Sequence, residues 1–262
     1  MSSSSSLIAL AGTPGWATTA ETLLHQNGFD VVQYHNLANL IDQLIEDYPV
    51  LLLVDGDQAD WSMQVSAPKT EQATRRIPIL VIASNPELAS QAINAGAEGF
   101  LMASDLSEKL LPQVVSIARL PDPEVAKELD CQCQESLPPL VQRAVEEFNS
   151  GAYYVQHDYF EKQWMAESGP VRELYRAALQ VGVAYYHITR GNHAGALRML
   201  QRSMQWFTML PDVCQGIDVR RLRDDAQRVR VALQAMNPTE ITSFDRSLLR
   251  PIHLIEDRPV EK

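Results

Sequence analysis

Over the first 119 residues, short apolar runs alternate with segments that have helical periodicity. This alternation constrains the fold more than any other feature of the sequence. Consecutive residues in these runs are apolar, and consecutive residues of a strand point to opposite faces. This indicates strands covered on both faces, as in a parallel sheet between two helical layers. They lie at 7–11, 31–34, 50–54, 77–83 and 99–102. Residues 7–119 are therefore predicted to form an α/β domain around a five-stranded parallel sheet.

The segments between the runs supply the helices of this domain. Apolar residues recur at helical spacing within 16–27, 37–45, 86–95 and 106–118, whereas 58–76 is polar and predicts no clear element. The order of strands and helices fits the flavodoxin-like, doubly wound fold.

The second half of the chain has helical periodicity almost throughout. In 219–236 the apolar positions follow a 3-4-3-4-3 spacing, which is typical of a helix packed against neighbouring helices. The fold class is therefore α/β plus all-α, with a C-terminal helical bundle. The predicted organisation is a disordered tail at 1–6, the α/β domain at 7–119, a linker at 120–138, the helical bundle at 139–237 and a second tail at 238–262.

Charge and cysteine usage limit the possible classes of function. The net charge is −11, and residues 1–119 hold five Lys or Arg against thirteen Asp or Glu, so this domain should repel nucleic acid and anionic membranes. The start lacks the basic and apolar regions of a signal peptide, and no run approaches the roughly 20 apolar residues of a membrane helix. Cys131, Cys133 and Cys214 are too few and too irregular for a disulfide framework, which predicts reduced thiols and a cytoplasmic protein.

Three segments of the α/β domain resemble the receiver domain of response regulators. YPVLLLVD, ending at Asp55, resembles the segment that ends in the phosphate-accepting aspartate. IPILVIAS at 77–84 resembles the fourth receiver strand, and AGAEGFL at 95–101 resembles the turn before the fifth. The three matches occur in the right order and at the right distances, and together they cover residues 7–119.

The chemistry of receiver phosphorylation is incomplete in this chain. Receivers hold Mg²⁺ with carboxylates after the first strand and pair the phosphoryl group with a lysine after the fifth. Here those positions are Gly12–Thr13 and Ala103, and the Ser/Thr position after the fourth strand is Ala83. Only Asp55 remains, followed by Asp57. We therefore expect Asp55 to cap a loop in a pseudo-receiver that does not take phosphate and that serves as an interaction module.

Two motifs of the helical half resemble the family called domain of unknown function 309. They are HDYFEKQW at 157–164 and YHITRGNHAGAL at 186–197, and Asp158 stands where the family usually has Glu. The resemblance spans about residues 140–210 and brings no established activity with it. The candidate site residues that it marks are His157, Asp158, Glu161, Trp164, His187 and Asn192.

These residues have two interpretations. His157 and Glu161 are four apart on one helix, so they could form a buried hydrogen-bonded pair beside Trp164 in the core. Alternatively, His157, Asp158, Glu161 and His187 could bind a metal or perform acid–base chemistry as a hydrolase-like module. The motifs H-E-x-x-H, the phosphate-binding loop and the nucleophile elbow are absent from the sequence.

The interpretation that we favour is a non-enzymatic, bacterial signalling or scaffold protein. We expect no catalytic residue, no cofactor, and a protein partner or self-association, including a homodimer, rather than nucleic acid or membrane. The arginines of 220–230, mixed with aspartates, offer a docking face for the acidic domain within the chain or across a dimer. The metal-binding or hydrolase-like module remains the alternative.

Overall fold

The computed structural model describes residues 6–255 and divides into two compact units, which meet in sequence at Leu120 and Pro121. Each unit is described by itself. In the described part of the chain, no helix has the length and apolar character needed to cross a lipid bilayer.

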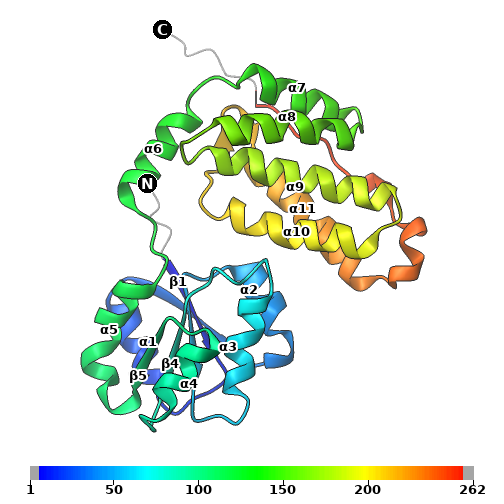
Figure 1. The fold of residues 1–262 in the computed structure, drawn as a ribbon. Coiled ribbons are helices and arrows are strands. Elements are labelled where there is room, and N and C mark those ends of the chain that lie inside the picture. Colours follow the sequence, from blue (N-terminus) through cyan, green and yellow to red (C-terminus); the bar gives the residue numbers. More distant parts are fainter. Residues whose placement is uncertain (1–5, 256–262) are drawn as a thin grey trace. The chain divides into compact units, whose positions relative to one another are not determined.

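The first unit is built on a five-stranded parallel sheet (Figure 1). Its strand order is β2-β1-β3-β4-β5, the order of flavodoxin-like folds. The pairing aligns Ile8 with Leu51 and Leu53 with Leu80. The predicted fold is thereby confirmed. The strands are β1 (Ser6–Ala11), β2 (Phe29–Tyr34), β3 (Leu51–Asp55), β4 (Ile79–Ala83) and β5 (Gly99–Met102).

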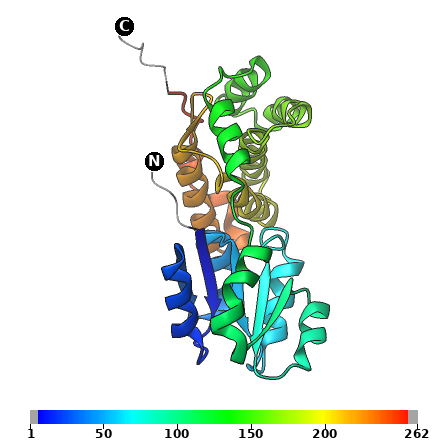
Figure 2. The ribbon, with the colours of Figure 1, turned by 90° about the vertical axis from the view of Figure 1, so that its left-hand side faces the viewer.

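Helices cover both faces of this sheet, as its predominantly apolar strands require. The helices α1 (Ala17–Gln26) and α5 (Leu106–Ile117) pack with one core, to which Leu10, Leu53 and Leu80 belong. Figure 2 shows this unit with α1 (blue) at the left edge and α5 (green) in front of the sheet. The opposite core is formed with α2 (Leu40–Asp47), α3 (Trp61–Thr70) and α4 (Leu88–Ala95). Short 3₁₀ turns, η1 (Leu37–Asn39) and η2 (Ala103–Asp105), precede α2 and α5.

Helix α3 occupies the stretch in which the sequence predicts no clear element. Gln64, Val65 and Pro68 are the buried residues of this helix, and Ser62, Met63 and Thr70 are exposed. The Thr74 hydroxyl donates to the Pro68 carbonyl at 2.9 Å, just after the helix ends at Thr70. The apolar stripe of α3 is too narrow to give a clear helical pattern in the sequence.

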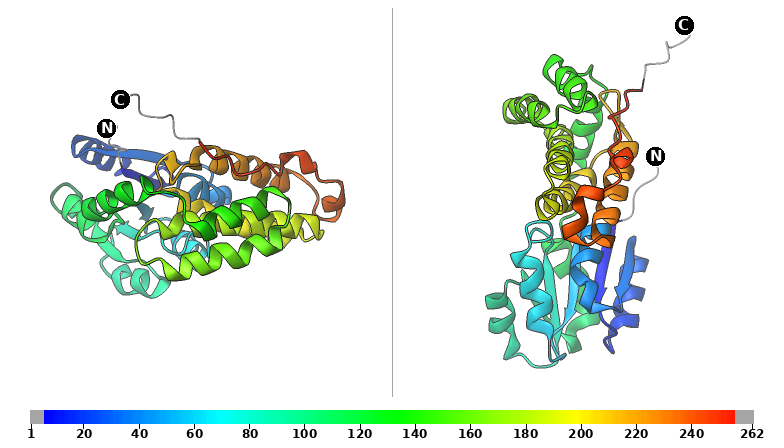
Figure 3. Two further views of the ribbon diagram at one scale, coloured as in Figure 1. Left: turned by 90° about the horizontal axis from the view of Figure 1, so that it is seen from above. Right: turned by 90° about the vertical axis from the view of Figure 1, so that its right-hand side faces the viewer.

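The second unit is a helical bundle in which consecutive helices pack side by side (Figure 3). Its longest member, α9, is buried along most of its length between α8 and α10. The helices are α7 (Pro139–Asn149), α8 (Tyr153–Ala166), α9 (Arg172–Thr189), α10 (His193–Phe207) and α11 (Val219–Ala235). A short hairpin of β6 (Val213–Cys214) and β7 (Ile217–Asp218) joins the last two.

The segment 120–138, expected as a linker, instead contains helix α6 (Pro123–Cys133). The Asp122 carboxylate caps its first turn by accepting from the Glu124 N–H, and Pro123 occupies the first helical position. Leu129 and Cys133 are the buried residues of this helix. Pro123, which the sequence predicts as part of a break in structure, therefore begins a helix.

The segment expected as a C-terminal tail is folded as far as residue 255. It forms η3 (Pro238–Ser243) and η4 (Arg246–Leu248), and then returns to the hairpin, where Leu254 bridges Ile217. The Asn149 side chain holds it through both the N–H and the carbonyl of Ile252, at 2.7 and 2.9 Å. At the other end of the chain Ser6 begins β1. The remaining parts of the two predicted tails, 1–5 and 256–262, lie outside the described residues.

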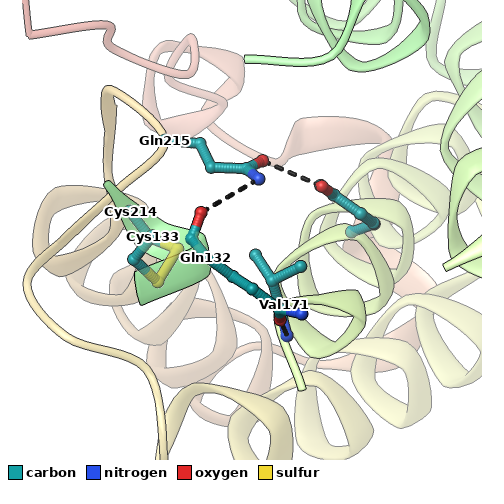
Figure 4. Close-up of a disulfide and its surroundings, with 6 residues drawn as sticks. Gln132, Cys133, Val171, Cys214 and Gln215 are labelled. Atoms are coloured by element: carbon teal, nitrogen blue, oxygen red, sulfur yellow. Dashed lines mark hydrogen bonds between the residues drawn. A yellow bond between two sulfur atoms is a disulfide. The ribbon is translucent and has the colours of Figure 1, made fainter. Parts of the chain in front are cut away.

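The cysteines are not all reduced, contrary to the sequence-based expectation. Cys133 and Cys214 form a disulfide, and Cys131 is free and exposed. Figure 4 shows Gln215 beside this bond, with its side chain between Gln132 and α9. The Gln215 N–H donates to the Cys133 carbonyl at 2.7 Å, and the Tyr175 hydroxyl donates to the Gln215 side chain at 2.8 Å. The disulfide thus joins the end of α6 to the hairpin before α11.

Candidate functional site

The first candidate position lies at the carboxyl end of β3, where Asp55 is 5% exposed. Both oxygens of its carboxylate have protein partners. Oδ1 accepts from the Asp57 N–H at 3.1 Å, and Oδ2 accepts from the Gln58 side-chain amide at 3.0 Å. Asp55 therefore closes the loop after β3, as expected of a loop-capping aspartate.

The neighbouring loops supply neither a second carboxylate at the first strand nor a lysine at the fifth. Gly12 ends β1 and accepts from the Gln33 side-chain amide at 2.7 Å, and Ala103 begins η2. Asp57 turns to the end of β4, where both of its carboxylate oxygens lie 3.0 Å from the Ser84 N–H. Asp55 thus stabilises the loop after β3 from within, and Asp57 connects this loop to the loop after β4.

Gly56 lies between these aspartates and explains how closely the loop follows β4. A Cβ placed on it would lie 2.8 Å from Val81 Cγ1 and 2.9 Å from the Ala83 Cβ, closer than such carbons approach. Its N–H donates to the Ile82 carbonyl at 2.8 Å. A side chain here would separate the loop from the strand. Sequence reasoning did not identify Gln58 or Gly56, because their partners become neighbours only when the sheet is formed.

The second candidate position is the face of α8 that carries His157. Its ring Nδ1 lies 3.3 Å from Asp158 Oδ1, and both side chains are partly exposed. The buried pair expected between His157 and Glu161 does not form in the described structure. Residues four apart share a helix face, but sharing a face does not by itself bring two side chains into contact.

Trp164, further along α8, contacts two arginines of α9. Arg176 stacks between two indoles, with its guanidinium carbon 3.6 Å from the ring centre of Trp206 and 4.9 Å from that of Trp164. The Trp206 N–H donates to Gln180 at 3.1 Å, and Trp206 is 7% exposed. Trp164 itself is only half-buried. The principal aromatic anchor is therefore Trp206 on α10, which the motifs of the sequence did not mark.

His187 and Asn192 do meet, at the corner between α9 and α10. The Asn192 side-chain oxygen accepts from the Gly195 N–H at 2.9 Å, which caps α10 and turns the amide nitrogen toward His187. That nitrogen donates to His187 Nδ1 at 3.1 Å. Burial lowers the pKa of His187, and Arg198 lowers it further, so the imidazole is neutral at pH 7. Its Nδ1 accepts, and its proton is on Nε2.

Two further residues of this motif complete the corner. Gly191 ends α9 with a φ of 71°, which favours glycine. His193, the neighbour of Asn192, is buried, and its Nε2 lies 2.7 Å from the Leu233 carbonyl near the end of α11. The corner therefore connects three helices through side chains of two consecutive residues.

Gly195 makes the contact between Asn192 and His187 possible. A Cβ on Gly195 would lie 2.5 Å from Asn192 Nδ2 and 2.9 Å from His187 Nδ1. We expect Gly195→Ala to lower the free energy of unfolding of the helical unit by a net of about 1–2 kcal/mol, although alanine favours helix. Urea unfolding followed by circular dichroism measures this. Wild-type protein is the reference. A variant as stable as the wild type would contradict the close packing.

The structure does not assemble the predicted residues into one centre. His157 and Asp158 form one pair, and His187 and Asn192 form another; Tyr154 and Tyr186 make the nearby contact between α8 and α9, with ring centres 5.4 Å apart. Among residues 6–255, no group of three or more His, Cys, Asp or Glu side chains is placed to hold a metal ion. The metal-binding alternative therefore has no assembled set of ligands in this part of the chain.

The corner at His187 and Asn192 is where the chain agrees with a known family. Residues 141–199 match DUF309, a domain of unknown function. The DUF309 match begins in α7 and ends within α10, so it includes both motifs. The predicted resemblance is confirmed. Within the segment that matches DUF309, Gly191, Asn192 and Gly195 of the second motif form the corner between α9 and α10.

The other comparisons concern the first unit. The chain is similar to the receiver domain of a sensor histidine kinase from Pseudomonas aeruginosa, with 17% identity and a TM-score of 0.40 over 44% of this chain and 98% of that one. It is also similar to a response regulator from Desulfuromonas acetoxidans, with 15% identity and a TM-score of 0.39 over 43% and 95%. No curated protein matches the chain. In the sequence, the unit with the five-stranded parallel sheet precedes the segment that matches DUF309.

Proposed function

We propose that the protein is a non-enzymatic signalling or scaffold protein whose receiver-like unit binds a partner without being phosphorylated. The observation that carries this proposal is the state of Asp55, whose two carboxylate oxygens already accept from Asp57 and Gln58. An amide donor occupies the oxygen that a cation would need, and the positions of Gly12 and Ala103 supply no charge to replace it. Without a cation, repulsion opposes the approach of a phosphoryl donor.

The expected result is that no phosphate is transferred to the protein from acetyl phosphate in the presence of Mg²⁺. Intact-mass spectrometry at neutral pH, before and after incubation, measures this directly. Asp55→Asn is the matched control, and a receiver with its full carboxylate set shows that the donor is active. A single phosphoryl adduct on the wild type that is absent from Asp55→Asn would overturn the proposal.

The proposed mode of action is binding to a protein partner or to a second copy of this chain, in a bacterial signalling context. The acidic surface of the first unit, with thirteen Asp or Glu against five Lys or Arg, supports a protein partner over nucleic acid or anionic membrane. Light scattering across a concentration series tests self-association. For a partner recovered with tagged protein, the proposal predicts that Asp55→Asn and acetyl phosphate leave its binding unchanged. A loss of binding in Asp55→Asn would instead indicate regulation through that carboxylate.

The cytoplasm remains the proposed location, and it gives the disulfide a particular meaning. Disulfides are rare in that compartment, and those that occur are usually transient or redox-sensing. In the cytoplasm the bond between Cys133 and Cys214 would therefore be reversible. Fractionation of the native host, followed by detection of the protein, tests the location independently.

A further inference from the structure

Helix α6 is attached to the helical unit almost entirely at its C-terminal end. Of its residues, Leu129 and Cys133 are buried, whereas Glu124, Lys127 and Glu128 are exposed. An isolated helix of this length is marginally stable in water, so α6 depends on its attachments. The same helix begins directly after the junction of the two units at Leu120 and Pro121. The contacts that attach α6 to the bundle therefore also determine how many residues connect the two units.

The attachments at the end of α6 form one small group around the disulfide (Figure 4). Cys133 bonds to Cys214, and its carbonyl accepts from the Gln215 N–H at 2.7 Å. The Gln132 side chain accepts from the Val171 N–H at 3.0 Å, and its carbonyl accepts from the Gln215 side chain at 3.3 Å. The disulfide is the single covalent member of this group, and it ties together residues 81 apart in sequence.

We propose that the bond between Cys133 and Cys214 is a redox-controlled tether for α6. With the bond formed, α6 is held against the bundle and the flexible connection between the units is limited to the few residues before Pro123. With the bond reduced, α6 separates from the bundle and the connection extends over 121–138. The chain would thereby convert the redox state of its surroundings into the freedom of its two units to move independently.

The reaction requires a dithiol reductant, such as dithiothreitol or a protein with a reactive thiol pair. Cys133 is 8% exposed and Cys214 is fully buried, so the reductant's thiolate attacks the Cys133 sulfur. The S–S bond breaks, and Cys214 leaves as a thiolate and takes up a proton. The second thiol of the reductant then displaces Cys133, which is protonated in turn. The protein gains two electrons and two protons, and the reductant becomes a disulfide.

Trypsin gives a direct test, because Lys127 in the middle of α6 is the one Lys or Arg between Arg119 and Arg143. Cleavage within a helix requires local opening. We expect dithiothreitol to speed cleavage after Lys127 by at least about tenfold, and by a clearly larger factor than cleavage after Arg143 in α7, which follows only the stability of the bundle. Cys131→Ser should respond like the wild type. Cys133→Ser should be cleaved at the fast rate with or without reductant.

Three results would overturn the proposal. The first is an equal rate of cleavage after Lys127 in oxidised and reduced protein. The second is an equal acceleration after Arg143, which would indicate that the whole helical unit loosens. The third is a titration of three free thiols in protein equilibrated with oxidised glutathione, since the bond would then not form. Small-angle scattering of the full chain provides the remaining check, because reduction should increase its maximum dimension and Cys133→Ser should show the larger value throughout.

Discussion

Replacing Trp206 by alanine should lower the free energy of unfolding of the helical unit by about 3–5 kcal/mol, the usual cost of truncating a buried large aromatic side chain. The ring is 7% exposed, its N–H donates to Gln180, and the Arg176 guanidinium stacks on it at 3.6 Å. The substitution removes the packed indole ring, the N–H that donates to Gln180, and the ring face that covers the Arg176 guanidinium. Urea unfolding followed by far-ultraviolet circular dichroism measures the loss.

Trp164→Ala is the matched comparison, because Trp164 contacts the same arginine from the other side. Its ring is half-buried and lies further from the Arg176 guanidinium, at 4.9 Å. The expected loss is about half of that for Trp206, since less surface is exposed by truncation. A loss for Trp164 equal to or larger than that for Trp206 would show that the α8 motif, and not α10, provides the main anchor.

Removing the disulfide should have an effect of similar size, restricted to the helical unit. Cys133→Ala combined with Cys214→Ala is expected to cost about 2–5 kcal/mol, the usual range for loss of a native disulfide. The size follows from the separation of 81 residues, because a long closed loop restricts the unfolded chain strongly.

Scanning calorimetry of the full chain measures this effect in both units at once. The transition of the helical unit should move to lower temperature, and the transition of the receiver-like unit should remain in place. Cys131→Ser is the control, because Cys131 is free and exposed. A shift of both transitions in the double variant would show that the two units unfold together.

The parallel sheet was predictable because its central strands are apolar on both faces. Leu51, Leu52, Leu53 and Val54 are all fully buried, so both faces of β3 require cover, which helices on the two sides of a parallel sheet provide. The residues that complete the loop at Asp55 were not predictable in the same way. Gln58 becomes a partner of Asp55 only because the loop turns back on itself. No sequence pattern of amide side chains predicts such a contact.

Three features of the helical unit could not be predicted from the sequence. The pairing of Cys133 with Cys214 depends on the packing of α6 against the hairpin, which spacing along the chain cannot reveal. The prolines at 121 and 123 indicated an interruption of structure, but proline at a first helical position also starts helices, and the sequence does not separate the two. Arg176 and Trp206 lie on different helices, so their stacking has no local pattern.

The corner between α9 and α10 has a consequence for how the length of this segment can vary. Asn192 points to the end of α9, and its neighbour His193 points to the end of α11. One inserted residue in the turn before Asn192 would rotate α10 by about 100° relative to α9. Both contacts would then be lost together, and no shift of one side chain could restore them. We therefore expect the length of this turn to be the same in all proteins that share this corner. Insertions should occur instead in connections where no pair of neighbouring residues contacts two different helices.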